Sequence, residues 1–461
     1  MTFNWPFSRV HFVGIGGIGM SAIAEMVQTL GIQVQGSDTS ENDNVRRLRE
    51  KGMTIFSKHD PVNIQGAEAV IYSTATQNNI EVLTAKESGI PVGHRSEMLA
   101  ELLKLKRSIC VAGTHGKTTT SSLIASILIQ ANLHPSFIIG GILNAQRSNA
   151  QMGNGDWVVA EADESDGSFL RLPTTIAVVT NIDPEHMDYY KTFDREKAAF
   201  LTMLNQTAFY GVNVVCSDHP VVRELLAQIS GRPIITYGLN STADVTAINI
   251  QTTATGSSFD VKATIKGKTI HIENVILNMM GQHNVQNALA AISVGLYLNI
   301  SPEIIKTALA TFAGIQRRLT NRGTFHHVLV YDDYAHHPNE IKATLAALKA
   351  HIPGRLVALW QPHRWTRFKD LYFDFLTAFE LTDQVFVTDV YAAGENPIEG
   401  CSISEFVQKL QLSKPCAYVP LSQAKEALSK TLKESDTLVC LGAGDISAFA
   451  KNLCKEDENA Q

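Results

Sequence analysis

Short apolar runs alternate with longer amphipathic segments along most of the chain. The first run is 10–13, a helical pattern follows at about 20–30, and further runs lie at 33–35 and 69–72. Runs of this length fit buried strands, and the segments between them are long enough for crossover helices. The residues up to about 107 are therefore predicted to form a parallel sheet covered by helices.

The same alternation repeats twice more. A second block begins with the apolar run 108–112 and ends near residue 321, and a third begins near residue 322 and includes a helical segment at 341–349. The third block is predicted to form another parallel sheet. Its candidate strands are 328–330, 356–359, 385–387 and 437–440.

One segment of the second block has a different period. Between 244 and 277 apolar and polar residues alternate, as at Val261, Ala263 and Ile265, and the tripeptide 266–268 contains a glycine. Alternation of period two around a glycine turn predicts an antiparallel hairpin. The whole pattern predicts an α/β fold of three domains, which are 1–107, 108–321 with this small antiparallel insert, and 322–461.

Composition agrees with this organisation and excludes several classes of protein. The chain has 461 residues, of which 44% are hydrophobic and 18% charged, and a formal net charge of −6. Lys and Arg are scattered, so we expect no nucleic-acid surface. No apolar stretch approaches the roughly 20 residues of a membrane span, and the N-terminus lacks the pattern of a signal peptide. The six cysteines form no C-x-x-C pair, which fits free thiols in a reducing compartment, so we expect a cytoplasmic protein. We also expect no membrane insertion, and a monomer or weak homodimer.

The strongest local signal is a glycine-rich loop between the apolar run 108–112 and a helix predicted at 120–130. The loop consists of Gly113, Thr114, His115, Gly116, Lys117, Thr118 and Thr119. Backbone N–H groups at such a turn point toward phosphate, and the helix N-terminus adds its positive end. Lys117 would neutralise the β- and γ-phosphates of ATP, and the Thr118 hydroxyl would bind Mg²⁺. Val111 stands where the usual phosphate loop has its first glycine, so a plain glycine turn is the alternative.

Carboxylates follow the next two apolar runs. The run 157–160 ends in an acidic segment, 161–166, and the run 176–179 leads into a segment that contains His186. Carboxylates this close together need a cation or solvent, and a histidine among them can bind a metal. Glu161 and His186 are therefore candidate metal ligands beside Thr118. An acidic surface loop with an ordinary histidine is the alternative.

A second glycine-rich loop, 14–19, has the pattern G-x-G-x-x-G and follows the first strand of the chain. The pattern predicts a diphosphate beside a helix N-terminus, but it does not say which nucleotide carries the diphosphate. The candidate ligands for a nucleotide-linked diphosphate, such as that of a nucleotide-sugar, are Gly14, Gly16, Gly17, Ile18, Gly19, Ser37, Asp38, Ser73, Thr74, Ala75, His94 and Arg95. A nicotinamide dehydrogenase and a purely structural glycine turn are the alternatives.

Two phosphate sites in one chain suit an enzyme that activates a group on a nucleotide-linked substrate. A dehydrogenase needs no ATP loop, and a plain kinase needs no separate diphosphate-sugar domain. From end to end the chain resembles the Mur ligases of peptidoglycan synthesis, and in particular their alanine-adding branch. The segments that carry the resemblance are 11–21, 112–119, 161–166, 180–189, 281–287, 317–318, 332–338, 361–364 and 442–445.

The resemblance implies a Rossmann-like N-terminal domain that holds UDP, a central phosphate-loop domain that holds ATP, and a Rossmann-like C-terminal domain that binds the amino acid and closes the site. It implies that ATP phosphorylates the lactyl carboxylate of UDP-N-acetylmuramate. The amine of L-alanine would then attack the acyl-phosphate. Lys117, together with Mg²⁺ held by Thr118, Glu161 and His186, would neutralise the charge that develops.

The resemblance also assigns residues around ATP. Asn284 and Asn287 lie one helical turn apart and would face the adenine. Arg318, at the hinge into the third domain, would reach the phosphates when the domains close. The residues that would complete the ATP site are Asp333 and His336 or His337. A capped turn before Pro338 is the alternative for the two histidines.

The amino-donor site is expected at the end of the strand 356–360, because open α/β sheets bind ligands at this edge. Arg367 is the candidate for holding the carboxylate of alanine with two bonds, and His363 lies beside it, whereas Arg364 would point elsewhere. Trp365 is a candidate for excluding larger side chains. Solvated residues at a helix start are the alternative.

Two other functions are open at this point. A murein peptide ligase attaches a recycled tripeptide to the same sugar and shares the phosphate loop and the segment 332–338. The residues 16–20 and 361–367 favour the alanine-adding branch instead. A nucleotide-gated binding protein without chemistry is the rival from a different class.

Overall fold

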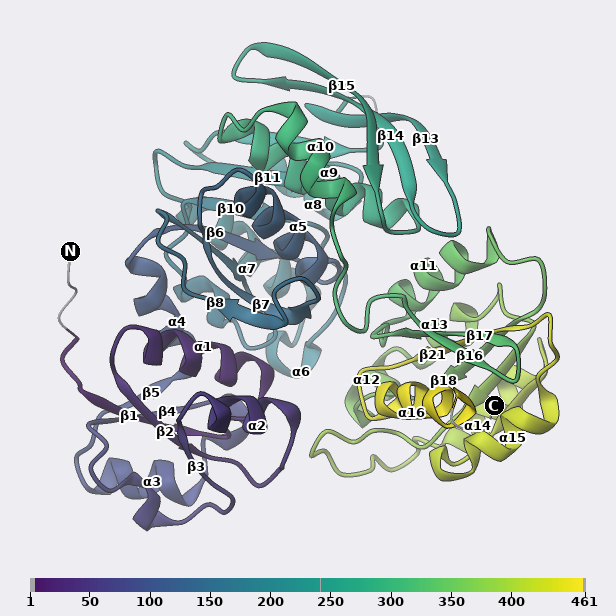
Figure 1. The fold of residues 1–461 in the computed structure, drawn as a ribbon, viewed down its shortest axis with the longest axis horizontal. Helices are drawn as coiled ribbons and strands as arrows, with labels where there is room; N and C mark the ends of the chain where they lie inside the picture. Colours follow the sequence, from purple (N-terminus) through teal and green to yellow (C-terminus); the bar gives the residue numbers. More distant parts are fainter. Residues whose placement is uncertain (1–4, 241, 459–461) are drawn as a thin grey trace. The chain divides into compact units, whose positions relative to one another are not determined.

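The computed structural model describes residues 5–240 and 242–458, which form two compact units (Figure 1). Unit 1 consists of Met1–Asn249, Phe259–Val275 and Gln286–Ala313, and unit 2 of Ile250–Ser258, Ile276–Val285 and Gly314–Gln461. Three sheets with intervening helices follow one another along the chain, which confirms the predicted α/β architecture.

The first sheet has the strand order β3-β2-β1-β4-β5, and all its pairs are parallel. Its elements are β1 (Arg9–Val13), α1 (Ile18–Thr29), β2 (Gln33–Ser37), α2 (Asp43–Glu50), β3 (Thr54–Phe56), β4 (Ala69–Tyr72), α3 (Ile80–Glu87), β5 (Val92–His94) and α4 (Arg95–Lys104). The predicted strands correspond to β1, β2 and β4, whereas the three-residue strands β3 and β5 are too short to show a period. Because the chain crosses from β3 to the other side of β1, a crevice opens at the C-terminal end of β1.

The central sheet has the order β15-β14-β13-β12-β11-β10-β6-β9-β7-β8. Its strands are β6 (Arg107–Ala112), β7 (Ser136–Leu143), β8 (Ser148–Gln151), β9 (Trp157–Glu161), β10 (Ile176–Val179), β11 (Val212–Cys216), β12 (Ile234–Gly238), β13 (Val245–Thr252), β14 (Ser257–Ile265) and β15 (Lys268–Leu277). Its helices are α5 (Lys117–Gln130), α6 (Met187–Tyr190), α7 (Phe193–Gln206), α8 (Pro220–Leu226), α9 (Gln282–Tyr297) and α10 (Pro302–Ala310). The predicted hairpin is β14 and β15. It extends this sheet through β13, which pairs in parallel with β12.

Helix α5 begins at Lys117, before the predicted start at residue 120, and Gly116 caps it with φ of 79°. The threonines at 118–120 are β-branched and are weak helix formers, but they are buried, so packing overrides their propensity. As a consequence, Lys117 and Thr118 occupy the first helical turn. The first backbone N–H groups of a helix have no acceptor within it, so those of this turn are available to bind an anion.

The third sheet has the order β16-β17-β21-β18-β19-β20. Its elements are β16 (Thr320–Phe325), β17 (Val328–Asp333), α11 (Pro338–Lys349), β18 (Leu356–Trp360), α12 (Trp365–Asp370), α13 (Tyr372–Ala378), β19 (Gln384–Val387), α14 (Ile403–Gln411), β20 (Cys416–Tyr418), α15 (Ala424–Thr431), β21 (Thr437–Leu441) and α16 (Ile446–Glu458). The prediction of a parallel sheet is wrong at one edge, where β16 is antiparallel to β17. His326 and His327 join these strands, both with positive φ, and such a two-residue turn connects only antiparallel neighbours.

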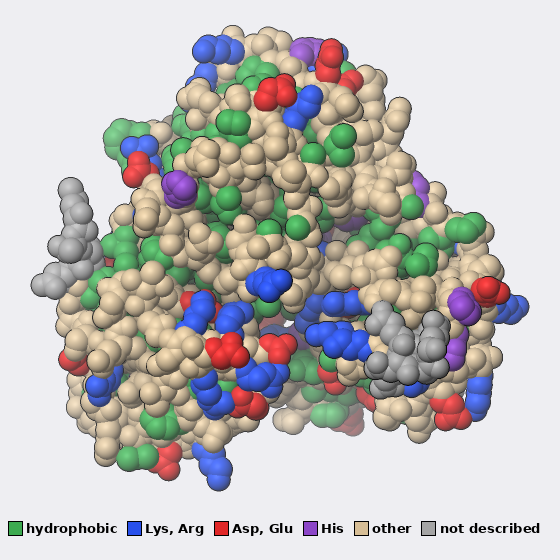
Figure 2. Space-filling model, in the orientation of Figure 1, with side chains coloured by type: hydrophobic (Ala, Val, Ile, Leu, Met, Phe, Trp, Pro, Cys, Tyr) green, Lys and Arg blue, Asp and Glu red, His purple; other side chains and the backbone are tan. Residues whose placement is uncertain are grey.

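The surface charge, the helices and the cysteines of the described residues also bear on the predictions from the sequence. On the face shown in Figure 2, Lys and Arg lie among Asp and Glu instead of forming one basic stripe. None of the helices within residues 5–240 and 242–458 is both long and apolar enough to cross a membrane. All six cysteines are free thiols.

Candidate functional site

The phosphate loop of unit 1 leaves β6 and is held in place by the residues that follow β10. A Cβ atom at Gly113, which has φ of 134°, would collide with the Thr180 hydroxyl. Thr180 Oγ1 donates to the carbonyl of His115 at 2.6 Å, and Asn181 Oδ1 accepts the N–H of His115 at 2.7 Å. The loop backbone is therefore fixed before any ligand arrives, which lowers the cost of binding phosphate.

Lys117 is folded back over this loop. Its Nζ donates to the carbonyls of Gly113 at 2.6 Å and Thr114 at 3.1 Å, and to Glu164 Oε1 at 2.9 Å. Burial alone would lower the pKa of Lys117, but the charges of Glu164 and Glu161 hold it above its usual value. The ammonium is therefore charged at neutral pH and is positioned to neutralise phosphate.

Glu164 is the main residue that the sequence interpretation missed. It is 1% exposed, burial raises its pKa to about 7 against the opposing charge of Lys117, and its Oε2 atom has no hydrogen-bond partner. His186 Nε2 lies 3.7 Å from its Oε1 atom. The acidic run 161–166 was noticed in the sequence, but a run of carboxylates does not show which side chain turns toward the loop.

The predicted metal ligands come from three elements of unit 1, and of them His186 lies near this glutamate. Thr118 lies in the first turn of α5, Glu161 ends β9, and His186 precedes α6 with φ of 57°. Glu161 Oε2 accepts the N–H of Gly140 at 2.8 Å. In the described residues no three His, Cys, Asp or Glu side chains already converge as a metal site. Thr118 and Glu161 nevertheless offer the hydroxyl and carboxylate oxygens that Mg²⁺ prefers, to which His186 would add a ring nitrogen. The Glu164 oxygen without a hydrogen-bond partner is compatible with a further cation here.

Asp183 is a second missed residue beside the loop. Its backbone N–H donates to Thr114 Oγ1 at 2.8 Å, and its carboxylate lies 3.1 Å from His115 Nε2 and 3.4 Å from His219 Nε2. The carboxylate thus links the loop histidine to the start of α8. Only the folded chain brings these positions together, since they are about seventy residues apart in sequence.

The two predicted asparagines of α9 differ in their surroundings. In unit 1, Asn287 Oδ1 accepts a bond from Thr120 Oγ1 at 3.2 Å, and a Cβ atom at Gly116 would lie 2.5 Å from the same oxygen. Asn287 therefore packs directly on the phosphate loop. Asn284, which belongs to unit 2, donates to the carbonyl of Met280 at 2.8 Å.

The first glycine loop is built from backbone contacts and one carboxylate. The N–H groups of Gly14 and Ile15 donate to the carbonyl of Ser37 at 2.8 and 3.0 Å. The N–H of Gly16 donates to Asp38 Oδ2 at 2.8 Å. Gly17 caps α1, so Ile18 and Gly19 lie in its first turn. Asp38 holds the loop itself in this structure, which the sequence pattern did not indicate.

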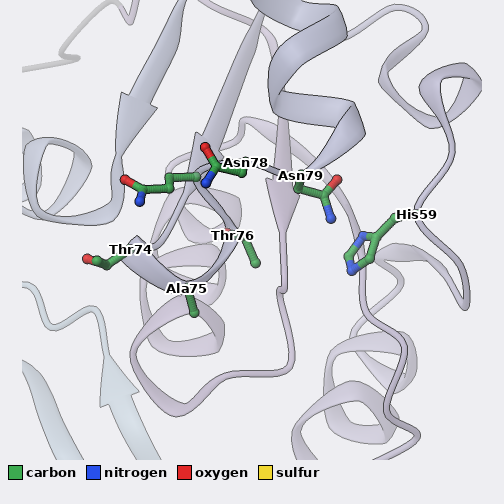
Figure 3. A pocket seen from close by; sticks show the side chains of 7 residues that line it. His59, Thr74, Ala75, Thr76, Asn78 and Asn79 are labelled. Atoms are coloured by element: carbon green, nitrogen blue, oxygen red, sulfur yellow. The ribbon is translucent and has the colours of Figure 1, made fainter. Parts of the chain in front are cut away.

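A pocket of about 440 Å³ opens beyond the C-terminal end of β4, in the first α/β block. Its lining comprises His59, Thr74, Ala75, Thr76, Gln77, Asn78 and Asn79. The predicted Thr74 and Ala75 belong to it, and His59, which was not predicted, stands on the side opposite Thr74 (Figure 3). His59 Nδ1 lies 2.9 Å from Ser37 Oγ, so the predicted Ser37 supports the pocket from behind.

The acidic run after β9 lies between the phosphate loop and the predicted sugar-site residues that follow β4 and β5. Thr74 Oγ1 donates to Asp166 Oδ2 at 2.9 Å and lies 3.1 Å from His94 Nε2. Arg95 donates to Asp163 Oδ2 at 2.8 Å. Burial alone would raise the pKa of Asp163, but Arg95 lowers it below the usual range. Asp163 and Asp166 therefore contact predicted sugar-site residues, whereas Glu164 contacts Lys117.

Unit 2 places its predicted ATP residues around the end of β17. Asp333 accepts the N–H groups of Leu319 at 2.6 Å and Ala335 at 2.8 Å, and burial raises its pKa to about 6. His337 caps α11 through a reciprocal pair with Glu340, which is the capped turn left open in the sequence. Arg318 NH1 lies 4.0 Å from Glu340 Oε1.

His336 instead lies with the predicted amino-donor residues. Its ring centroid is 5.8 Å from that of His363. Arg367 NH1 donates to His363 Nδ1 at 3.0 Å and to the His363 carbonyl at 3.2 Å. Burial lowers the pKa of His363 to about 3, so its ring is neutral and accepts from Arg367. Arg364 turns toward Glu395, 3.9 Å away.

Three family models match the chain in order. They are "Mur ligase family, catalytic domain" at residues 9–107, "Mur ligase middle domain" at 111–295 and "Mur ligase, glutamate ligase domain" at 317–444. The chain is 48% identical to UDP-N-acetylmuramate–L-alanine ligases of Brucella anthropi and of Bradyrhizobium sp. strain BTAi1, over 97% of both chains in each case.

Solved structures agree with these relatives. The crystal structure of UDP-N-acetylmuramate–alanine ligase from Thermotoga maritima is similar with a TM-score of 0.83 and 28% identity, over 98% of this chain and 100% of that one. A murein peptide ligase from Psychrobacter arcticus shares the fold, with a TM-score of 0.74 and 24% identity over 98% and 99% of the two chains. With matching domains from residue 9 to residue 444 and close relatives over nearly its full length, the chain belongs to the Mur ligase family.

Proposed function

We propose that this chain joins L-alanine to the lactyl carboxylate of UDP-N-acetylmuramate, with ATP as co-substrate and Mg²⁺ as metal, in cytoplasmic synthesis of the peptidoglycan precursor. The observation that carries the proposal is the acidic run 161–166. It contacts Lys117 of the phosphate loop through Glu164, and Arg95 and Thr74, two of the predicted sugar-site residues, through Asp163 and Asp166. An enzyme that phosphorylates a group on a UDP-sugar needs these two sites side by side. The full-length relatives carry the name of this activity.

We assign the three segments 1–107, 108–321 and 322–461 to UDP-sugar, ATP and amino-acid binding. In the first step a lactyl carboxylate oxygen attacks the γ-phosphorus, and the bond to the β–γ bridging oxygen breaks, releasing ADP. Two anions meet in this step. Lys117 and the loop N–H groups, held by Thr180 and Asn181, offset their repulsion because these groups are fixed in a buried site.

Thr118, Glu161 and His186 would hold Mg²⁺ next to Lys117. When bound, this ion supplies further positive charge to the phosphate oxygens. Glu164 keeps the Lys117 ammonium directed at the loop, since its Oε1 is 2.9 Å from Nζ. Asn287 supports the loop from the side of α9.

In the second step the amine of alanine attacks the acyl carbon, and inorganic phosphate leaves as the C–O bond breaks. The amine loses a proton in forming the amide. Arg367 holds the alanine carboxylate, and the neutral His363 ring accepts one guanidinium N–H and so fixes its orientation. Asp333, which accepts two backbone N–H groups, sets the position of the segment that carries His336.

Phosphate release tests the proposal. The protein is incubated with ATP, Mg²⁺ and UDP-N-acetylmuramate, and with L-alanine, the murein tripeptide or no amino donor. Release that requires both the sugar and alanine supports the proposal. Release with the tripeptide alone would assign the chain to murein peptide ligation, and nucleotide binding without release would assign it to a binding protein.

Calorimetry tests the first glycine loop separately. UDP-N-acetylmuramate should bind, and NADH should not, because the full-length relatives are named for this UDP-sugar. The loop adjoins the His59 pocket, since a Cβ atom at Gly14 would lie 3.1 Å from Thr76 Cγ2. Tight NADH binding would favour the dehydrogenase alternative.

A further inference from the structure

Four aromatic rings form a continuous row across the C-terminal ends of strands in unit 2. Tyr334 and His336 have centroids 5.1 Å apart, His336 and His363 5.8 Å, and His363 and Tyr391 5.5 Å. The last pair is stacked, with 8° between the ring planes. Arg367 is bonded to His363, so the row runs past the proposed carboxylate site.

Tyr391, which follows β19, is the most firmly fixed ring of this row. Its backbone N–H donates to the carbonyl of Pro362 at 2.8 Å, and its carbonyl accepts the N–H of Arg364 at 2.9 Å. Behind the ring lies Gly444, where a Cβ atom would be 2.5 Å from Tyr391 Cγ. The ring therefore contacts both His363 and the backbone at Gly444, and these two contacts restrict its movement.

Trp365, the size-selecting residue suggested by the sequence, has different surroundings. It is partly buried and packs against the hydrophobic core that contains Trp360 and Phe368. Tyr391 remains 39% exposed and stands beside His363. A residue that excludes larger ligands must face the ligand and resist displacement. Tyr391 suits this role better than Trp365, because it is partly exposed beside His363 and is restricted by its contacts with His363 and Gly444.

We propose that Tyr391 sets the size limit for the amino donor. The inference rests on the proposed function, in which Arg367 and His363 hold the donor carboxylate. Because the Tyr391 ring stacks on His363, which is bonded to Arg367, a donor whose carboxylate is held there would direct its side chain toward a surface that includes this ring. A side chain longer than methyl would then meet a ring whose movement His363 and Gly444 restrict.

The test compares kcat/KM for L-alanine with kcat/KM for L-2-aminobutyrate, which is longer by one methylene. One methylene against a rigid wall typically changes selectivity by roughly 10- to 200-fold. Tyr391→Ala should therefore raise the ratio for aminobutyrate over alanine by about 10-fold or more. Tyr391→Phe keeps the ring and should keep this ratio within about 2-fold, as should Trp365→Phe in the core.

Gly444→Ala provides an independent variant, because its methyl group would lie 2.4 Å from Gln361 Oε1 and 2.5 Å from Tyr391 Cγ, and would displace the ring instead of removing it. It should lower kcat/KM for alanine more than for glycine, by roughly 10-fold. This variant decides the matter if Tyr391→Ala does not fold, as judged by its thermal unfolding. An unchanged alanine-to-glycine ratio in folded Gly444→Ala protein would then overturn the proposal.

The outcomes separate this inference from the function on which it rests. If the wild-type protein does not use alanine at all, the proposed function fails. If the wild type uses alanine and Arg367→Ala raises the KM for alanine, but folded Tyr391→Ala keeps the wild-type selectivity, only the inference fails. Relaxed selectivity in Trp365→Phe with none in Tyr391→Ala would move the size limit to Trp365.

Discussion

Two buried glutamates lie near the two glycine loops of unit 1, and they differ in how many hydrogen bonds their carboxylates accept. Glu81, near the first loop, is fully buried, and both its carboxylate oxygens are engaged. Its partners are His11, Ser37, His59, Asp60 and Asn63. Glu164, near the phosphate loop, has one oxygen without a partner. The sequence offers no hint of this difference.

The pKa values follow from these surroundings. Burial alone would raise the pKa of Glu81, but hydrogen bonds from His11, Ser37 and Asn63 lower it to about 2. Burial raises the pKa of Glu164 to about 7, because the charge of Lys117 only partly offsets the cost of burying the carboxylate. A saturated carboxylate stabilises the fold, whereas an unsaturated one leaves a position for a bound cation. Both loops are thus glycine-rich turns from a strand to a helix, and they differ in the charged groups around them.

The largest expected effect is at the phosphate loop. Lys117→Ala should reduce kcat by about 1,000-fold or more, because charge neutralisation is lost where phosphoryl transfer needs it. Binding of UDP-N-acetylmuramate, measured by calorimetry, should change little. Lys197→Ala is the matched control, since this partly exposed lysine pairs with Asp194 and Glu224. Turnover of Lys117→Ala near the wild-type rate would remove the loop from the mechanism.

The next effect concerns the predicted metal ligands around Glu164. Glu161→Ala and His186→Ala should each lower kcat by roughly 100-fold and leave sugar affinity nearly unchanged, because they act on charge that develops in the transition state. Initial rates over a range of Mg²⁺ concentrations are the measurement. His186→Ala with full activity at every concentration would show that His186 is not a ligand.

A smaller effect is expected at the first loop. A Cβ atom at Gly16 would lie 2.7 Å from Val45 Cγ2 and 2.9 Å from Asp38 Oδ2, so Gly16→Ala displaces the loop. Its dissociation constant for UDP-N-acetylmuramate should rise about 10-fold with ATP binding unchanged. Gly17→Ala, whose Cβ would be 3.5 Å from the nearest atom, should have a smaller effect. Equal effects of the two would show that sterics do not set the affinity.

The smallest effect is one of stability. Glu81→Gln should lower the free energy of unfolding by about 1.5–3 kcal/mol at pH 7, as expected for hydrogen bonds to a charged group. The folded-state pKa, about 2, lies below the ordinary 4.5. The ionised group therefore stabilises the fold fully above about pH 5, and this contribution is lost as the pH falls toward 2. Urea titrations at pH 7 and pH 3 should show a smaller difference between wild type and variant at pH 3.

Much of the fold was predictable because long parallel sheets leave strong patterns. The strands β1, β4, β6 and β10 were found within a residue or two, since each is an apolar run bounded by polar segments. The start of α5 was misplaced because its threonines pack against the protein, contrary to their propensity. The antiparallel β16 was missed because its two-histidine turn lacks the glycine that usually marks one.

The sequence by itself determined the two glycine loops, Lys117 with its threonine, and the pairing of His363 with Arg367, because each depends on neighbours within one helical turn. Only the tertiary structure decided that Glu164 contacts Lys117, that His59 lines a pocket with Thr74, and that Tyr391 stacks on His363. These contacts join separate strands at one sheet edge. No local pattern records which side chain turns toward which across that distance, since burial and packing in three dimensions set the choice.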